Sequence, residues 1–361
     1  MMRVIELLDR LIAFPTVSSQ SNLALIDWAQ AHLEACGFAV TRVPSPCGEK
    51  AGLIANRGGA GGVVLSAHTD VVPAEGQAWS RDPFRLTRDG ARLYGRGTTD
   101  MKGFVACALA LAEQPAATQG PVSIVLSWDE EVGCRGIPHM ISHLESALGP
   151  QALCVVGEPT SLVMATGHKG KAAYRATCHG VAGHSAMAPQ FRNALHGACD
   201  LVANIRAEQA RLMRDGAQDA GYDVPCSTLH VGKLQGGTAL NIVPDCAIVD
   251  WEIRHLAAET PDEIVPRVMS GLEHVALEQV FAYPGLDTDP DLPALANLRG
   301  LSRGVCKVSY GTEAGVFVPT GIPTVVCGPG VMAQGHQPNE FIELDQLAGC
   351  MEMLEALVAR G

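Results

Sequence analysis

The sequence has no long, uninterrupted run of apolar residues. No segment approaches the roughly 20 apolar residues that a helix needs to cross a bilayer. At the N-terminus, Glu6 and Asp9 interrupt the apolar residues of M-M-R-V-I-E-L-L-D-R-L-I, which is unlike the continuous apolar core of a signal peptide. We therefore expect a soluble, cytoplasmic protein.

Closely spaced cysteines are also missing, although the chain contains 12 cysteines. The nearest two in sequence are Cys36 and Cys47, so no C-x-x-C pair exists. Thiolate zinc sites and compact disulfide frameworks normally use closer spacings. We interpret the cysteines as the reduced thiols of a cytosolic protein.

Positive charge is scarce: 26 Lys and Arg residues stand against 38 Asp and Glu residues, which gives a formal net charge of −12. This excess of negative charge argues against nucleic acid or an anionic membrane surface as the main partner. Repeats, low-complexity segments and disordered linkers are absent from the sequence as well. The length of 361 residues exceeds the usual size of one hydrophobic core and predicts two domains.

Strands and helices are predicted to alternate toward both ends of the chain. Such alternation is typical of an α/β domain with a mostly parallel, mixed sheet flanked by helices. The expected elements are β-like runs at 63–67, 122–127 and 154–157, a hairpin turn at Asp89-Gly90, and helices at 4–12, 101–111 and 344–358.

The middle of the chain has a different order of elements, β-α-β-β-α, which is that of a small sandwich of one open sheet and two helices. Thr260 and Glu263 form the capping box that begins the second helix. We predict an inserted α+β two-layer sandwich over 171–276, which leaves 1–170 and 277–361 as one discontinuous domain. The expected elements are strands at 171–179, 227–234 and 246–254 and a long helix at 193–213.

Five sequence blocks carry the residues that indicate a chemical function. They are V-V-L-S-A-H-T-D at 63–70, G-R-G-T-T-D-M-K-G at 95–103, L-S-W-D-E-E-V-G at 126–133, V-V-G-E-P-T at 155–160 and G-H-Q-P-N-E at 335–340. In three blocks a buried strand ends in a His or a carboxylate, and open α/β sheets build their sites at strand ends. If the blocks converge, their imidazoles and carboxylates suit a pair of divalent metal ions such as zinc. The candidate ligands are His68, Asp100, Glu131, Glu158 and His336.

These residues also have structural interpretations. A single His such as His68 is more often a hydrogen-bonded structural residue than a ligand, although Asp70 could accept its second ring N–H and fix the tautomer that a metal needs. Asp100 could simply cap the helix that follows it. The Asp129-Glu130-Glu131 run could be a solvated acidic turn, but three carboxylates directly after a buried strand repel one another unless a cation or a proton intervenes.

Taken together and in this order, the blocks resemble the dizinc amidohydrolase family of acetylornithine deacetylases, succinyl-diaminopimelate desuccinylases, aminoacylases and related carboxypeptidases, over essentially the whole chain. The resemblance implies that Glu130 is the general base and that Asp129 has no assigned role. It also implies two metal ions per subunit, with Asp100 bridging them, His68 and Glu158 completing one site, and Glu131 and His336 completing the other. Cobalt or manganese suits such ligands as well as zinc does.

The same resemblance assigns roles to residues outside the metal blocks. It implies that His184 reaches the active site from a partner subunit and stabilises an oxyanion, and hence a homodimer joined through the inserted lid or dimerisation domain. Asn241 and Arg254 match positions that hold the carboxylate of the substrate, although Arg254 could instead pair with acidic surface groups. Further candidates for the substrate pocket are Lys169, Thr312 and Glu313.

Within the family, G-R-G-T-T-D-M-K-G-F, Y-G-T-E-A-G and G-H-Q-P-N-E resemble the acetylornithine deacetylases more than the desuccinylases. Thr99 and Asn339 depart from the pattern, in which Cys and Asp are more usual. The implied activity is the release of ornithine and acetate from Nα-acetyl-L-ornithine in arginine biosynthesis. The alternatives are another N-acyl amino acid deacylase (an acetylcitrulline deacetylase or a desuccinylase) and a dipeptidase or aminopeptidase on the same scaffold. A zinc-holding binding protein without catalysis is a further hypothesis, but it would not need Glu130 beside a ligand carboxylate.

Overall fold

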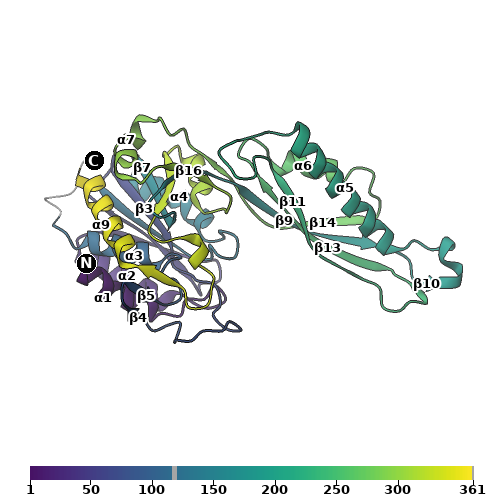
Figure 1. The fold of residues 1–361 in the computed structure, drawn as a ribbon, viewed down its shortest axis with the longest axis horizontal. Coiled ribbons are helices and arrows are strands. Elements are labelled where there is room, and N and C mark those ends of the chain that lie inside the picture. The colour runs from purple at the N-terminus through teal and green to yellow at the C-terminus, as the bar shows by residue number, and fades with distance from the viewer. Residues whose placement is uncertain (116–119, 360–361) are drawn as a thin grey trace. The chain divides into compact units, whose positions relative to one another are not determined.

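The computed structural model describes residues 1–115 and 120–359, and the chain divides into two compact units (Figure 1). Unit 1 consists of Met1–Gly167, Asp287–Cys306 and Thr312–Gly361, and unit 2 consists of His168–Leu286 and Lys307–Gly311. Unit 1 is therefore discontinuous in sequence. Among the described residues, no helix has both the length and the hydropathy that crossing a membrane requires.

Unit 1 is built around a mixed sheet whose centre is parallel. Among the described residues the sheet has nine strands, in the order β1-β2-β6-β3-β7-β17-β8-β15, with β16 paired to β8. Strands β6, β3, β7 and β17 run parallel to one another, so all four end at the same edge. The strands span Ala39–Pro44 (β1), Ala51–Arg57 (β2), Val63–His68 (β3), Val122–Ser127 (β6), Leu153–Pro159 (β7), Met164–His168 (β8), Leu286–Asp287 (β15), Val305–Val308 (β16) and Thr324–Gly328 (β17).

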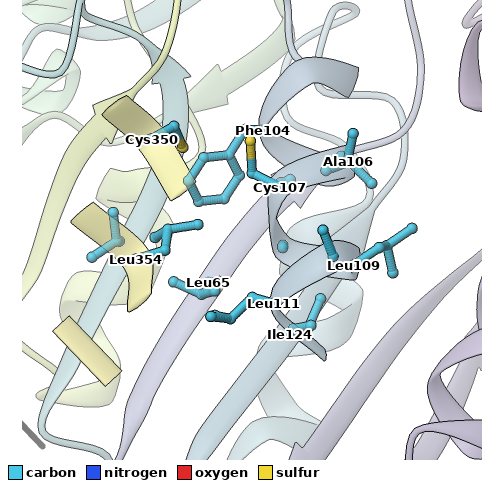
Figure 2. Packing of buried hydrophobic residues seen from close by; sticks show 14 of the residues in the cluster. Leu65, Phe104, Ala106, Cys107, Leu109, Leu111, Ile124, Cys350 and Leu354 are labelled. Carbon is cyan, nitrogen blue, oxygen red and sulfur yellow. The ribbon is translucent and has the colours of Figure 1, made fainter. Parts of the chain in front are cut away.

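Helices cover both faces of this sheet. Alternate residues of a strand point to opposite faces, and Leu65 of β3 and Ile124 of β6 join one apolar cluster with helices α1, α2, α3 and α9. Figure 2 shows side chains of α3, α9 and these two strands meeting in the cluster. The other face packs against α4, where Met140 lies against Gly52 of β2. The helices span Met2–Ile12 (α1), Leu23–Ala35 (α2), Lys102–Ala112 (α3), Ile137–Leu148 (α4), Ala296–Leu301 (α7), Ala314–Phe317 (α8) and Leu344–Ala359 (α9).

The predicted hairpin is present as β4 (Thr87–Asp89) and β5 (Arg92–Tyr94), which pair antiparallel. Gly90 in the turn has a φ of +60°, a conformation that glycine adopts without steric cost. Strand β5 also pairs with β18 (Phe341–Glu343), which directly follows the G-H-Q-P-N-E block. This small sheet therefore brings the chain before Asp100 next to the chain after His336.

Unit 2 is an α+β sandwich, as predicted. Its antiparallel sheet has the order β11-β13-β9-β14, and the helices α5 and α6 share an apolar cluster with the strands β9 and β13. The capping box of Thr260 and Glu263 begins α6. The elements span Gly170–His179 (β9), Ala194–Asp215 (α5), Thr228–Gly236 (β11), Cys246–His255 (β13), Pro261–Val268 (α6) and Val275–Tyr283 (β14).

Unit 2 is longer than the predicted segment 171–276, because that boundary falls inside strand β14. The strand pairs with β9 from Val275, opposite Cys178, to Tyr283, opposite Lys171. All its side chains are exposed or half-buried. The unit continues to Leu286.

Candidate metal centre

Asp100 lies at the centre of the predicted ligands. Its Oδ1 atom is 3.1 Å from Nε2 of His68, and its Oδ2 atom is 3.2 Å from Nε2 of His336. The two oxygens of one carboxylate therefore face two different imidazoles. Asp100 is buried and lies shortly before the start of α3.

A glutamate accompanies each of the two histidines. Oε1 of Glu158 lies 3.4 Å from Nε2 of His68, and Oε2 of Glu131 lies 3.0 Å from Nε2 of His336. The structure thus brings all five candidate ligands together in two groups, and the two groups share Asp100.

The ends of parallel strands position three of these side chains. His68 is the last residue of β3, Glu158 lies near the end of β7, and Glu131 follows shortly after β6. Because β6, β3 and β7 are adjacent and parallel, their carboxyl ends meet at one edge of the sheet. Asp100 and His336 reach the same place from loops.

The tautomer of His68 is fixed by its surroundings. Its Nδ1 atom lies 2.9 Å from the backbone oxygen of Asp70. A carbonyl oxygen only accepts hydrogen bonds, so Nδ1 carries the proton of the neutral ring, and in that form Nε2 has the lone pair that a metal ion requires. The carboxylate of Asp70, which was the expected partner, is farther away, at 3.6 Å from Nδ1.

The carboxylate of Asp70 instead holds the loop that follows β6. It accepts hydrogen bonds from the backbone N–H groups of Glu130 and Glu131, at 3.1 and 3.3 Å, and from the hydroxyl of Ser18 at 2.7 Å. Asp70 therefore positions the backbone of both glutamates. Ser18 was not among the predicted residues, because nothing in the T-V-S-S segment distinguishes it from an ordinary loop.

Glu130 lies among the candidate ligands. His68, Glu130 and Glu158 present ligand atoms within 4.8 Å of one another, as do His68, Asp100 and Glu131. Oε1 of Glu130 accepts a hydrogen bond from Sγ of Cys134 at 3.4 Å. Glu130 is placed either to join a metal ion or to act on a molecule beside one.

The crowding of carboxylates changes their pKa values. Burial, together with repulsion from Asp100, raises the pKa of Glu131 to about 7 and the pKa of Glu158 to about 8. Burial and repulsion from Glu158 raise the pKa of Glu130 well above its ordinary value. Burial opposes the ionisation of Asp100, but hydrogen bonds from His336 and His68 hold its pKa below the ordinary value.

These features fit a site for cations. Divalent ions would allow all the crowded carboxylates to ionise at neutral pH. Oε1 of Glu158 is buried and accepts no hydrogen bond from the part of the chain that the structure describes. Imidazole nitrogens combined with carboxylate oxygens are ligands that zinc and related divalent ions prefer. The residues present therefore fit a pair of such ions.

The carboxylate of Asp129 is paired with a lysine and not with the candidate ligands. It forms an ion pair with Lys50, whose ammonium group also donates to the backbone oxygen of Ser18. Lys50 thus ties the N-terminal loop to the residue before Glu130, and the carboxylate of Asp129 is neutralised. This contact gives a structural role to the one acidic residue of the run that had no predicted role.

Glu313 and Thr312 are buried in unit 1. The oxygens of Glu313 accept hydrogen bonds from the hydroxyls of Ser66, at 2.6 Å, and Ser127, at 2.5 Å, which belong to the adjacent strands β3 and β6. The hydroxyl of Thr312 accepts a hydrogen bond from the N–H of Ala314 at 3.0 Å. These contacts are structural, and the substrate-binding role of both residues stays a prediction.

His184 and Asn241 lie side by side in unit 2. Strand β10 (Gly183–His184) pairs with β12 (Ile242–Val243), and the N–H of Ser185 donates to the backbone oxygen of Asn241 at 3.1 Å. Nδ1 of His184 accepts a hydrogen bond from the N–H of Ala186 at 3.1 Å, so the neutral ring carries its proton on Nε2. Both side chains are exposed.

Arg254 and Lys169 have partners inside unit 2. Nε of Arg254 donates to Glu252 at 3.0 Å and Nη1 to the hydroxyl of Tyr283 at 3.2 Å, while the arginine side chain stays 31% exposed. Lys169 is buried, and its ammonium group donates to backbone oxygens of the 224–226 segment at 2.8 and 2.6 Å. The substrate-binding roles of Arg254 and Lys169 stay predictions.

Strand ends and loops of unit 1 gather two imidazoles and two glutamates around one shared aspartate, and the family of the chain identifies this arrangement as the site of a metal-dependent hydrolase. The chain belongs to the peptidase family M20/M25/M40, whose family model matches residues 64–360. An acetylornithine deacetylase from Myxococcus xanthus is 34% identical to it over 375 residues, which cover 98% of this chain and 96% of the relative.

Solved structures of the family share the fold. An M20 family metallo-carboxypeptidase from Sulfolobus solfataricus aligns with a TM-score of 0.81 at 17% identity and covers 99% of both chains. A dinuclear metal binding peptidase of the M20 family from Bacillus subtilis aligns with a TM-score of 0.70 at 15% identity, over 99% of this chain and 97% of the other. The predicted fold class is confirmed.

Proposed function

We propose that this enzyme hydrolyses Nα-acetyl-L-ornithine to L-ornithine and acetate, in arginine biosynthesis, as a cytoplasmic homodimer. The similarity to the acetylornithine deacetylase of Myxococcus xanthus, 34% identity over 98% of this chain, carries the substrate assignment. The two histidines that face one carboxylate of Asp100 support the reaction class. All twelve cysteines lie in the described part of the chain and are free thiols, as in proteins of a reducing compartment.

Two divalent ions would be held by the candidate ligands, with zinc as the first choice and cobalt or manganese as alternatives. His68 and Glu158 would hold one ion, Glu131 and His336 the other, and Asp100 would bridge the two. When bound, such ions acidify a water molecule and polarise the amide carbonyl of the substrate. The remaining steps depend on the side chains of the protein.

Glu130 is the proposed general base. Its carboxylate takes a proton from the attacking water and then donates that proton to the nitrogen of the leaving amine. The net reaction adds one water across the amide C–N bond. Asp70, itself held by Ser18, keeps the backbone of Glu130 in place.

Unit 2 would supply groups that recognise the substrate. We infer that His184 of the partner subunit donates a hydrogen bond to the developing oxyanion, which its Nε2 proton would allow. Asn241 and Arg254 would hold the α-carboxylate, for which a guanidinium fork is well suited. Lys169, Thr312 and Glu313 are further candidates for binding the substrate.

Ornithine release tests the substrate assignment. Protein stripped with a chelator and reloaded with Zn²⁺ is given Nα-acetyl-L-ornithine, Nα-acetyl-L-citrulline, N-succinyl-diaminopimelate and an unblocked dipeptide at equal concentrations. We expect metal-dependent release of ornithine and the highest kcat/KM with acetylornithine.

The other outcomes separate the alternatives. A higher kcat/KM with another N-acyl amino acid would reassign the substrate and keep the reaction class. Turnover of the unblocked dipeptide alone would indicate a dipeptidase. If two metal ions bound per chain and none of the four compounds reacted, the proposed function would be wrong.

A further inference from the structure

Glu340, the last residue of the G-H-Q-P-N-E block, has no part in the chemistry proposed above. Its side chain is nonetheless buried, with 1% of its surface exposed. Oε1 accepts hydrogen bonds from the backbone N–H groups of Thr99, at 2.9 Å, and Asp100, at 3.1 Å. Oε2 accepts one from the N–H of Gly97 at 3.0 Å. One carboxylate therefore holds three amides of the loop that presents Asp100.

Arg96 fixes this carboxylate in turn. Its Nη1 atom lies 2.7 Å from Oε2 of Glu340, and both side chains are almost completely enclosed. The same guanidinium donates to the side-chain oxygen of Gln77, whose Nε2 atom donates to the backbone oxygen of His336 at 2.9 Å. The network thus reaches both Asp100 and His336.

The loop that carries His336 needs such support. His336 and Asn339 have backbone φ values of +60° and +58°. Residues other than glycine rarely adopt such values unless their surroundings enforce them. Asn339 is held because its side-chain oxygen accepts hydrogen bonds from the N–H and the hydroxyl of Ser80, at 3.0 and 2.9 Å. His336 itself is 48% exposed and has no strand to position it.

The other half of the site shares only Asp100 with these contacts. His68 and Glu158 lie on β3 and β7, which pair with each other in the centre of the sheet. Asp100 meets His68 through Oδ1 and His336 through Oδ2. A change at Glu340 would therefore alter the spacing between Asp100 and His336 more than the spacing between His68 and Glu158.

We propose that Glu340 is a positioning residue for the subsite formed by His336, Glu131 and Oδ2 of Asp100, and that it holds the two loops of this subsite in register by binding the amides of 97–100. This inference rests on the proposed dinuclear site and deepens it. Replacing a buried residue that orients a metal ligand typically weakens metal binding by about 10–100-fold.

Titration of metal-free protein with Co²⁺ or Zn²⁺ tests the proposal without any substrate. In Glu340→Gln, an amide NH₂ replaces one acceptor oxygen and faces backbone N–H donors. We expect one metal ion to bind with wild-type affinity and the second to bind about 10–100-fold more weakly. The Co²⁺ absorption spectrum should change for the second equivalent only. Excess metal should restore most of kcat.

A matched control is available in the adjacent pair of strands, β5 and β18. Glu343 of β18 forms an ion pair with Arg92 of β5 at 2.8 Å, three residues from Glu340, but both side chains are partly exposed. Glu343→Gln should keep two metal ions at wild-type affinity. If Glu340→Gln and Glu343→Gln bound metal alike, or if Glu340→Gln weakened both subsites equally, Glu340 would only stabilise the fold and the proposal would be wrong.

Gln77→Ala provides a second variant in case Glu340→Gln does not fold. Gln77 is only half-buried, and its loss frees the backbone of His336 without burying a charge. We expect a smaller weakening of the same second metal ion, and unchanged affinity for both ions would contradict the proposal. If the wild-type protein bound fewer than two metal ions, the dinuclear site would be wrong as well. If every variant bound two metal ions with wild-type affinity, only the role of Glu340 would be wrong.

Discussion

Glu130 and Glu131 are neighbours in sequence, but their side chains have different surroundings. Both oxygens of Glu131 lie within 3.1 Å of Nε2 of His336, whereas Glu130 contacts the thiol of Cys134. Asp70 binds both backbone N–H groups, so the two side chains leave a fixed loop in different directions. This difference separates a candidate ligand from a candidate base.

Glu130→Gln should therefore retain both metal ions and lose most of its turnover. The amide has nearly the same shape but cannot take a proton from water, and general base catalysis typically contributes about 10²–10⁴-fold to the rate. We expect kcat to fall by that factor while metal content, measured by elemental analysis, stays at two per chain.

Asp129→Asn is the control for this substitution. It removes the neighbouring carboxylate, which pairs with Lys50 and not with the candidate ligands. It should retain its metal ions and most of its turnover. Near-normal kcat in Glu130→Gln, or a loss of metal from it, would show that Glu130 is not the base.

At this scale the sequence predicted the candidate ligands and missed the groups that hold them. His68, Glu131 and Glu158 follow apolar strands, and that local pattern can be recognised. The contacts of Asp70 and Glu340 are mainly to backbone amides, from segments 60 and 240 or more residues away. Every residue except proline offers such an amide, so no sequence pattern marks the partner.

The packing of α3 on the sheet depends on a glycine in β7. A Cβ atom built on Gly157 would lie 2.0 Å from the ring of Phe104, which Figure 2 shows in the core of unit 1. Gly157→Ala must displace either this ring or the strand that carries Glu158. We expect unfolding in urea to show a loss of about 1–3 kcal/mol, as in other overpacked cores.

Gly197→Ala is the matched glycine substitution in a helix. The position lies inside α5, and the nearest heavy atom to the new Cβ would be 3.7 Å away, on Cys178. Alanine should stabilise the helix by about 0.5–1 kcal/mol. Equal effects of the two substitutions would contradict the close contact between Gly157 and Phe104.

The helices of unit 2 are joined through Glu208 of α5. Its carboxylate accepts hydrogen bonds from Arg211, one turn later, at 2.8 Å, and from Arg267 of α6 at 2.7 Å. Burial opposes ionisation, but these hydrogen bonds hold the pKa of Glu208 below its ordinary value. Both arginines are partly exposed, so solvent screening reduces the contribution to about 1 kcal/mol.

Glu208→Gln should therefore destabilise unit 2 in a pH-dependent way. Because the folded pKa is lower than the unfolded pKa of about 4.3, the stabilisation is complete above that pH and is lost as the pH falls through the folded value. Urea unfolding should separate wild type from variant by about 1 kcal/mol at pH 7 and by progressively less below pH ~4. A constant difference across this range would contradict the charge-based explanation.

Elements with a strong local pattern were predicted well, whereas the predicted end of the inserted domain fell inside strand β14. The hairpin at Asp89-Gly90 follows from its turn residues, and α6 follows from its capping box. Strand β14 is stabilised by pairing with β9, about 100 residues away in the chain, and the local sequence does not show how far such pairing extends. Only the structure shows that the strand ends at Tyr283.

For the whole molecule, metal removal should affect the two units differently. The candidate ligands all belong to unit 1, so bound ions stabilise that unit, by about 2.7 kcal/mol per site when the free metal is at 100 times Kd. Trp128 lies in unit 1, and Trp251, which stacks on Tyr174, lies in unit 2.

Single-tryptophan variants can report the two transitions separately. Chelation should lower the unfolding temperature seen by Trp128 and leave that seen by Trp251 unchanged. An equal shift at both residues would mean that the two units unfold as one, and no shift at Trp128 would mean that metal binding does not stabilise unit 1.

Strand β17 lies between β7 and β8 in the sheet, although residues 160–323, including all of unit 2, separate it from β7 in the chain. On the ribosome, β7 is therefore synthesised long before β17, and until then the edge of β7 that pairs with β17 stays unpaired. At roughly 5–20 residues per second, the delay is on the order of ten seconds. His336 is translated later still, so the nascent chain exposes His68, Asp100 and Glu158 while the second imidazole is missing. Stalled or truncated products would then carry an aggregation-prone strand edge and half a metal site, which makes the last part of translation the step that commits the enzyme to activity.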